Sequence, residues 1–218
     1  MAPRRLGAVL VGLAVAGIAA LALSDGGRDV PGERPAVRRP DLALLTSLPL
    51  VFGEQFGLDE SGSPALTRIE QRYRVKPIGV ADAASLSGHK LLLMAQPRAQ
   101  PAEALVELDR WVRAGGHLLL LADSRLEWPS ERPLGDLLRP PPTFADTGLL
   151  NHWGLQLSPS GLEGDGRCSV AEGGLIAHCR IGRGRAIVIA DADFVNVDQP
   201  GAPGLDRLIV ELGRLESR

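Results

Sequence analysis

Residues 90–124, KLLLMAQPRAQPAEALVELDRWVRAGGHLLLLADS, consist of two apolar runs on either side of an amphipathic segment. The apolar runs, Leu91–Ala95 and Leu118–Ala122, carry no charge, as is typical of strands that are covered on both faces. Between them, Pro101–Ala114 places apolar residues at helical spacing, and Gly115 follows where a left-handed residue commonly ends a helix. Two strands joined by one helix form a β-α-β unit, which requires a parallel sheet. The segment therefore predicts an α/β domain.

Shorter elements are predicted on both sides of this unit from the same periodicities. The strand that contains Pro77 is expected at or near a sheet edge, because proline donates no hydrogen bond to a ladder. The segment Ala81–His89 is expected to be a short connection. The predicted strands are Leu42–Leu45, Val75–Val80, Leu155–Leu157 and Arg185–Asp191, and the predicted helices are Pro64–Tyr73, Gly148–Trp153 and Gly204–Leu215.

A proline-rich segment, Arg125–Thr147, interrupts the pattern after the second strand of the unit. It contains Pro129, Pro133 and the run Pro140–Pro142, and only Leu134–Leu138 suggests a short helix. A long loop after the carboxyl end of a strand is typical of a lid or a partner-binding surface. Open α/β sheets also bind ligands at that edge. This loop is therefore the first candidate for a binding region.

A β-hairpin is predicted near the C-terminus, from Cys168–Glu172 and Leu175–Ile181 around the turn Gly173-Gly174. In this register Cys168 lies opposite Cys179, and these are the two cysteines of the chain. In an exported domain such a pair is expected to form a disulfide. Counting from the turn places the pair at a hydrogen-bonded position, where Cα atoms lie about 5.5 Å apart.

Length and composition indicate one globular domain with an extension. The 218 residues contain 24 Lys and Arg and 26 Asp and Glu, which gives a net charge of −2. This balance argues against nucleic acid as a partner, because no strong positive field is present. Hydrophobic residues make up 44% of the chain and aromatic residues 4%, so aliphatic side chains must fill most of the core.

The N-terminus contains an uncharged run of 19 residues, Leu6–Ser24, and a bilayer-spanning helix needs roughly 20 apolar residues. Arg4 and Arg5 precede it, so the positive-inside rule places the N-terminus in the cytoplasm and the remainder outside. A buried core helix is the weaker interpretation for a run of this length. Two alternatives remain: an uncleaved anchor, which the length favours, and a cleaved signal peptide, which Ala20-Leu21-Ala22 favours.

Both alternatives export the folded domain. We expect a single-pass protein of the inner membrane, attached through Leu6–Ser24, with its C-terminal domain in the periplasm. Asp25–Pro40 is rich in Gly, Pro and Arg and predicts a flexible tether. Its arginines either contact lipid head groups or are simply solvated, and the nearby acidic residues favour solvation. The chain is thus divided into an anchor or signal at residues 1–24, a linker at 25–40 and a folded domain at 41–218.

Three motifs together resemble a known group of proteins. They are LLLMAQPRAQPAEALVELDRWVRAGGHLLLLAD at residues 91–123, TGLLNHWGLQL at 147–157 and IGRGRAIVIADADFVN at 181–196. The chain resembles, over roughly Leu42–Leu212, the exported domain of gliding-motility-type ABC-transporter auxiliary proteins and their uncharacterised relatives. The resemblance implies a class I glutamine amidotransferase-like, flavodoxin-like three-layer fold and an accessory role at a membrane transporter.

The chemistry of true class I amidotransferases is not predicted. Those enzymes use a cysteine on a sharp turn after a strand, activated by a histidine. Here the corresponding strand is followed by Asp123 and Ser124, and Ser124 does not lie in a G-x-S-x-G motif. The late strand ends in aspartates where the catalytic histidine would follow. We therefore expect a non-enzymatic domain with no catalytic residue and no cofactor.

Asp123, Asp191 and Asp193 all follow predicted strands and are expected near one carboxyl edge. Three carboxylates can hold Mg²⁺ or Ca²⁺. Aspartates after strands more commonly cap helices or close Asx-turns, and that is the favoured interpretation.

The other polar candidates are weaker. No histidine forms an H-x-x-x-H pair, so histidine ligation of a metal is not expected. Gly182-Arg183-Gly184-Arg185 opens a strand and lacks the G-K-[ST] of a phosphate loop, and Arg180, Arg183 and Arg185 are expected to form a solvated hairpin tip.

Two functions follow as hypotheses. The favoured one is a non-catalytic, membrane-anchored extracytoplasmic domain that binds a membrane-protein partner or a ligand, as an accessory of an ABC-type transporter or envelope complex. The alternative is a divergent metal-assisted hydrolase that uses Asp123, Asp191 and Asp193.

Overall fold

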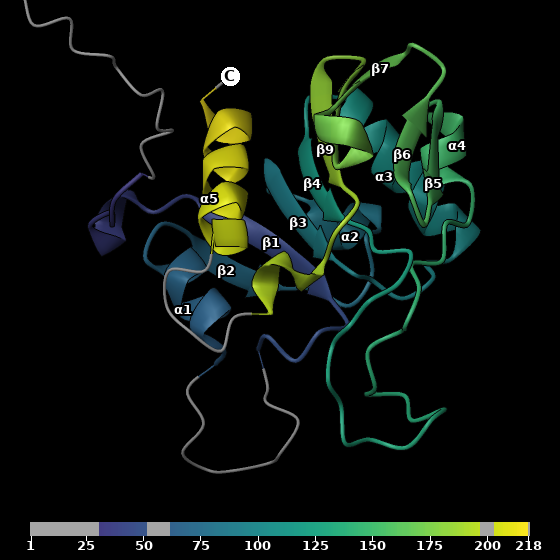
Figure 1. The fold of residues 1–218 in the computed structure, drawn as a ribbon. Coiled ribbons are helices and arrows are strands. Elements are labelled where there is room, and N and C mark those ends of the chain that lie inside the picture. Colours follow the sequence, from purple (N-terminus) through teal and green to yellow (C-terminus); the bar gives the residue numbers. More distant parts are fainter. Residues whose placement is uncertain (1–30, 52–61, 197–202, 218) are drawn as a thin grey trace, which may run out of the picture.

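The computed structural model describes residues 31–51, 62–196 and 203–217. Its centre is a seven-stranded sheet in the order β2-β1-β3-β4-β9-β8-β7 (Figure 1). The first five strands in this order are parallel, and β8 and β7 continue the sheet as antiparallel strands. The strands are β1 (Asp41–Thr46), β2 (Arg74–Pro77), β3 (Leu91–Ala95), β4 (His117–Leu121), β7 (Cys168–Ala171), β8 (Ile176–Ile181) and β9 (Gly184–Ile189).

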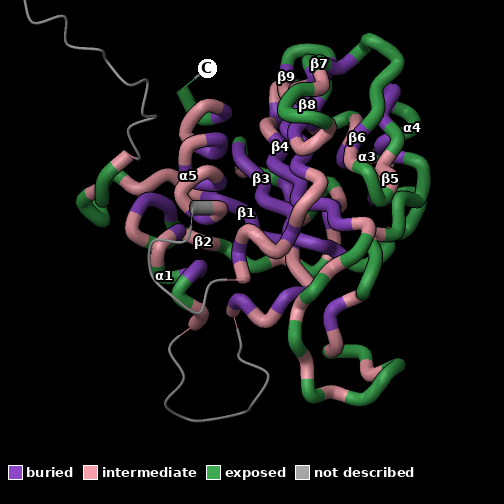
Figure 2. Tube along the Cα trace, viewed as in Figure 1, coloured by how far each residue is buried: buried purple, intermediate pink, exposed green. Residues whose placement is uncertain are grey.

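Helices cover both faces of the sheet, which gives the domain three layers (Figure 1). Alternate residues along the strands supply two apolar clusters: Leu93 and Leu121 pack with α5, and Leu92 and Leu120 pack with α3. The central strands β1, β3, β4 and β9 are accordingly buried along most of their length (Figure 2). α1 (Pro64–Glu70) and α5 (Pro203–Glu216) lie on one face, and α2 (Ala83–Leu86), α3 (Ala102–Arg113), α4 (Leu149–His152), β5 (Leu155–Ser158) and β6 (Gly161–Gly164) lie on the other.

The predicted β-α-β unit is confirmed. β3 and β4 pair in parallel, and Leu91 lies opposite His117 at the start of the register. Between them, α3 buries Ala104, Leu108 and Val112 on the face that contacts the sheet. The position of β2 at the sheet edge is confirmed as well, in agreement with Pro77. The mostly parallel α/β architecture is therefore the one that the apolar runs predict.

One local prediction is wrong, and two short elements were not predicted. Leu134–Leu138 contains turns and no helix, because it is flanked by prolines and its leucines are exposed instead of packed in the core. The connection Ala81–His89 contains α2, which Asp82 caps by accepting a hydrogen bond of 2.7 Å from the Ser85 N–H. The strand β6 was not predicted, and it pairs antiparallel with β5 in a separate two-stranded sheet.

The cysteine pairing is confirmed: Cys168 lies opposite Cys179, and the two form a disulfide. Their Cα atoms are 4.4 Å apart, a spacing typical of a non-hydrogen-bonded pair, so the predicted position in the ladder is wrong. The predicted two-residue turn is wrong too. The connection runs from Glu172 to Leu175, includes the 3₁₀ segment Glu172–Gly174, and has positive φ at Glu172 and at both glycines.

Residues 31–40, which the sequence assigns to the tether, contact the folded domain. The Arg34 guanidinium pairs with the Glu216 carboxylate at the end of α5 at 2.7 Å. The Arg34 N–H also donates to the Gln71 carbonyl at 2.9 Å, and Arg72 donates to the Gly32 carbonyl. Within the described ranges no helix is long and apolar enough to cross a membrane, and the predicted span Leu6–Ser24 lies outside those ranges.

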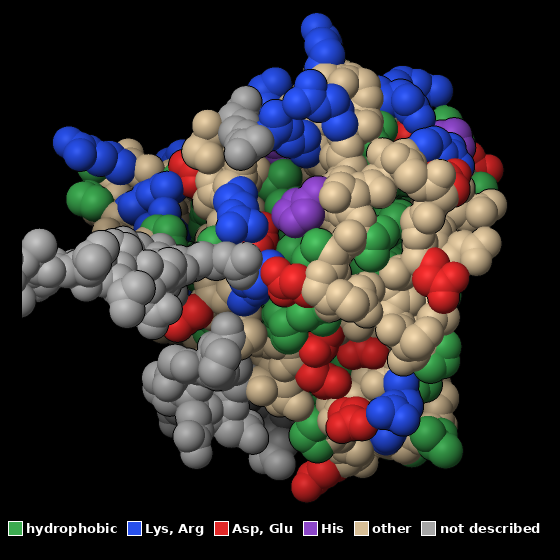
Figure 3. Space-filling view, turned by 45° about the horizontal axis from the view of Figure 1, so that its top comes forward, with side chains coloured by type: hydrophobic (Ala, Val, Ile, Leu, Met, Phe, Trp, Pro, Cys, Tyr) green, Lys and Arg blue, Asp and Glu red, His purple; other side chains and the backbone are tan. Residues whose placement is uncertain are grey.

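Charge is unevenly distributed over the domain. Figure 3 shows Lys and Arg side chains gathered mainly in the upper half of the view, over the hairpin end and the end of α5. Carboxylates are more frequent below. On the face in view, basic and acidic side chains are therefore partly separated.

Candidate functional site

The carboxyl ends of β1 and β3 form the topological switch point of the sheet. From β1 the chain crosses to β2 on one side, and from β3 it crosses to β4 on the other. Open α/β sheets bind ligands in the crevice at such a point. A cavity of about 360 Å³ lies here. It is lined by Leu44, Leu45, Thr46, Ser47, Leu48, Pro49, Val51, Pro77, Ile78, Gly79, Arg98, Gln100, Arg132, Leu137 and Leu138.

The proline-rich loop, residues 125–147, supplies one wall of this cavity. Arg98 holds it through backbone carbonyls, donating to Leu137 and, at 2.6 Å, to Arg139. Leu137 and Leu138 line the cavity and are still 81% and 56% exposed. Exposed leucines on a backbone that is held in place are typical of a surface that another molecule covers.

Gln96 fixes the position of this loop, and the sequence reasoning missed it. The side chain is fully buried, and its amide pairs with both backbone groups of Asp123: Oε1 accepts from the N–H at 2.8 Å and Nε2 donates to the carbonyl at 3.2 Å. Nε2 also donates to the Pro141 carbonyl at 3.2 Å. Gln96 has a φ of 42°, which is uncommon for a residue other than glycine. The sequence signal that could have identified Gln96 is its position as a polar residue directly after a buried strand and before Pro97.

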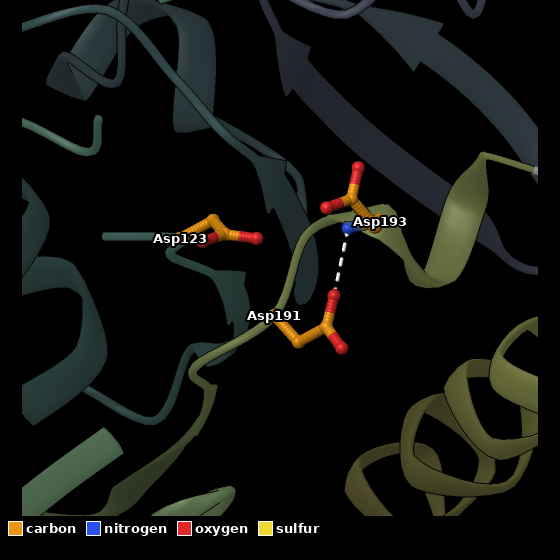
Figure 4. A group of neighbouring side chains, drawn as sticks. All are labelled: Asp123, Asp191 and Asp193. Carbon is orange, nitrogen blue, oxygen red and sulfur yellow. Dashed lines mark hydrogen bonds between the residues drawn. The ribbon is translucent and has the colours of Figure 1, made fainter. Parts of the chain in front are cut away.

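The three candidate aspartates converge, as predicted (Figure 4). One carboxylate oxygen from each lies within 4.8 Å of the other two. Asp123 and Asp191 both close Asx-turns: Asp123 accepts from the Arg125 N–H at 2.7 Å, and Asp191 accepts from the Asp193 N–H at 2.8 Å. Asp123 and Asp191 thus form the Asx-turns expected of aspartates after strands, and the three carboxylates lie together at one edge.

Asp193 differs from the other two. Its Oδ2 accepts from the Glu127 N–H at 3.0 Å, whereas its Oδ1 is buried and has no hydrogen-bond partner among the described residues. Burial raises the pKa of the Asp193 carboxyl, and the nearby charges of Asp123 and Glu127 raise it further. Burial, followed by the charges of Asp123 and Asp193, likewise raises the pKa of Asp191.

These shifts lower stability at neutral pH. A carboxyl whose pKa is higher in the folded than in the unfolded state favours folding at low pH, and that contribution is lost as the pH rises through the folded pKa. The folded protein is therefore more stable when the three carboxylates share a proton or a bound cation than when all three are charged without one. Carboxylate oxygens at this spacing suit a hard divalent ion such as Mg²⁺ or Ca²⁺.

The other singled-out residues lie away from this edge. Cys168 and Cys179 form their disulfide in the hairpin, so neither is a nucleophile. Within the described residues no histidine joins a group of three potential metal ligands. After β4 the chain continues with Ala122, Asp123 and Ser124, without a cysteine.

Comparison with known proteins adds evidence for the fold alone. No family model matches the sequence, and no curated protein matches it either. Among solved structures, the mmIFT52 N-terminal domain superposes with a TM-score of 0.55 at 13% identity, over 82% of this chain and 98% of that one.

Two further matches are weaker. The Cytoplasmic Protein STM3548 from Salmonella typhimurium matches with a TM-score of 0.48 at 10% identity, over 80% of this chain and 98% of that one. The exo-beta-1,4-mannosidase Op5Man5 from Opitutaceae bacterium strain TAV5 matches with 0.46 at 14% identity, over 81% of this chain and 36% of the enzyme.

Proposed function

We propose that the chain is a non-catalytic, membrane-anchored extracytoplasmic domain that binds a membrane-protein partner, as an accessory of an ABC-type transporter or envelope complex. The observation that supports this function best is the apolar cavity at the switch point, with Leu137 and Leu138 exposed on its rim. Concave apolar sites with a few polar groups at the edge are typical of binding sites. The partner inserts an apolar group there.

We also propose a more specific fold and a cellular location for the domain. The three-layer sheet is compatible with a class I amidotransferase-like domain, and the resemblance to gliding-motility-type auxiliary proteins suggests its transporter context. The uncharged run Leu6–Ser24 supports an inner-membrane anchor with the N-terminus inside. The disulfide supports exposure of the domain to an oxidising compartment.

The cavity rim is tested by partner capture. The full chain is purified from membranes in mild detergent, and the co-purifying proteins are quantified for wild type and for the Leu137→Ser/Leu138→Ser variant. We expect the variant to lose its main partner by about tenfold or more, as for an interface hot spot. Leu134→Ser is the matched control, because Leu134 lies in the same loop and is exposed but does not line the cavity. Equal capture by all three proteins would rule out this rim as the binding surface.

A second candidate function, a metal-assisted hydrolase, is favoured by the convergence of Asp123, Asp191 and Asp193 and by the unpartnered Oδ1 of Asp193. If it is correct, Mg²⁺ or Ca²⁺ at 100 times Kd stabilises the chelator-washed protein by about 2.7 kcal/mol. Thermal melts of the full chain measure this effect. Asp193→Asn is expected to melt higher than wild type without the ion, because like charges are reduced, and to show no response to it. A wild-type melting temperature that no divalent ion changes excludes this candidate.

A further inference from the structure

A row of basic side chains crosses the amino edge of the sheet, opposite to the cavity. The parallel register of β4 and β9 places His117 beside Arg185, and the antiparallel register of β9 and β8 places Arg185 beside Arg180. Lys90, directly before β3, and Arg183, in the β8–β9 turn, extend this set and are exposed. We call Lys90, Arg180, Arg183 and Arg185 the basic edge.

The pairing of Arg180 with Arg185 is unfavourable for the isolated domain. Like charges directly opposite each other on neighbouring strands destabilise a sheet. In the part of the chain that the structure describes, neither guanidinium forms an ion pair, and Arg180 is exposed to solvent. Burial lowers the pKa of His117, and the positive charges of Arg185 and Lys90 lower it further. The electrostatic potential at this edge is therefore positive. Such an arrangement suits a polyanionic surface outside the domain.

The basic edge is held rigidly. The Arg183 N–H donates to the Arg113 carbonyl at 3.0 Å, and its guanidinium donates to the Ala114 carbonyl at 3.0 Å. Gly184 packs so closely on the end of α3 that a Cβ there would meet the Val112 and Gly116 carbonyl oxygens. The turn therefore presents its charges on a fixed backbone, which lowers the entropic cost of binding.

The N-terminal segment of the domain enters on the same side. α5 runs opposite to the parallel strands, so its C-terminal end lies toward their amino ends (Figure 1). Arg34 pairs with Glu216 at that end of α5. The apolar run Leu6–Ser24 precedes Arg34 by only a short stretch of chain, so an inserted anchor keeps this end of the domain close to the bilayer.

We propose that the basic edge rests on the anionic phospholipid head groups of the bilayer in which the chain is anchored. This inference rests on the proposed membrane anchoring. Charge complementarity selects the lipid, because clusters of Lys and Arg beside a membrane-spanning segment bind anionic head groups. The orientation has a consequence for function: it turns the cavity at the carboxyl edge away from the membrane, toward a partner.

The two lysines of the chain allow a direct test, because Lys90 lies in the basic edge and Lys76 lies on the outer strand β2. Both are exposed. The full chain is reconstituted into nanodiscs of phosphatidylcholine, with or without phosphatidylglycerol, and treated with a water-soluble acylating reagent. We expect phosphatidylglycerol to slow the acylation of Lys90 about fivefold and to leave Lys76 unchanged. High salt should abolish the difference, because it screens the attraction.

Variants test whether the arginines of the basic edge cause the protection of Lys90 from acylation. In Arg180→Gln/Arg185→Gln, Lys90 is expected to react at the same rate with and without phosphatidylglycerol. Arg125→Gln is the control, since Arg125 is an exposed arginine at the opposite, carboxyl edge and its loss should leave the protection intact. If the wild-type chain inserts into the nanodiscs and Lys90 reacts equally fast in both lipids, the docking proposal is overturned and the anchoring is not. Protection that requires a co-purified protein instead of phosphatidylglycerol overturns it in favour of a protein partner. A chain that does not enter nanodiscs overturns the anchoring, and the docking with it.

Discussion

Replacing both Cys168 and Cys179 with alanine is expected to lower the free energy of unfolding by about 3 kcal/mol. The disulfide closes a loop with a sequence separation of 11, and without it the unfolded chain gains the corresponding conformational entropy. The bridge joins β7, the outermost strand, to β8. Among the described residues β8 alone pairs with β7 in the sheet, so the strand depends on the cross-link more than a central strand would.

Thermal melting of the full chain with and without reductant measures this effect. Wild type should melt at a lower temperature in reductant, and the alanine variant should melt at the same temperature in both conditions. The variant thus separates loss of the disulfide from other effects of the reagent. Equal labelling of native and reduced wild type by a thiol-blocking reagent would show that the bridge does not form.

The fold was largely predictable because its strands are buried on both faces. Runs such as Leu91–Ala95 and Leu118–Ala122 have no polar position, which is typical of central strands of a covered sheet. β6 could not be found in this way. It is a four-residue strand with only Leu162 buried, and it depends on pairing with β5. Local periodicity does not report such a pairing.

The candidate site was predictable only in part. Aspartates that follow parallel strands had to lie at one edge, and Asp123, Asp191 and Asp193 do. The cavity depends instead on the path of the proline-rich loop, which Gln96 and Arg98 determine through backbone groups far away in sequence. Hydrogen bonds of this kind join residues at no regular sequence spacing, so a sequence pattern does not predict them. The turn at Glu172–Leu175 escaped prediction for a related reason, because two adjacent glycines permit several turn types.

Replacing Gln96 with alanine is expected to cost about 3 kcal/mol and to release the proline-rich loop. The substitution removes three hydrogen bonds and leaves the Asp123 N–H and the Pro141 carbonyl without that partner, whereas the Asp123 carbonyl still accepts from the Phe144 N–H at 2.6 Å. Buried polar groups without a partner cost about 1–3 kcal/mol each, and partial rehydration offsets some of that loss. Because Pro141 and Leu137 belong to the same loop, the cavity wall should loosen together with the domain.

Two comparisons isolate the role of the side chain. Gln96→Gly removes the same hydrogen bonds but relieves the left-handed backbone, so it should be less destabilising than alanine by about 1 kcal/mol. Gln100→Ala removes an amide that is bonded to the Ala81 N–H and to the Arg98 carbonyl, and it should cost about 1 kcal/mol with no effect on the loop. Thermal melts measure stability, and the rate of chymotryptic cleavage after Leu134 and Leu137 measures release of the loop. If Gln96→Ala is cleaved no faster than Gln100→Ala, Gln96 does not hold the loop, and the position of the loop depends on its other contacts, such as those of Arg98 and that of the Glu127 N–H with Asp193.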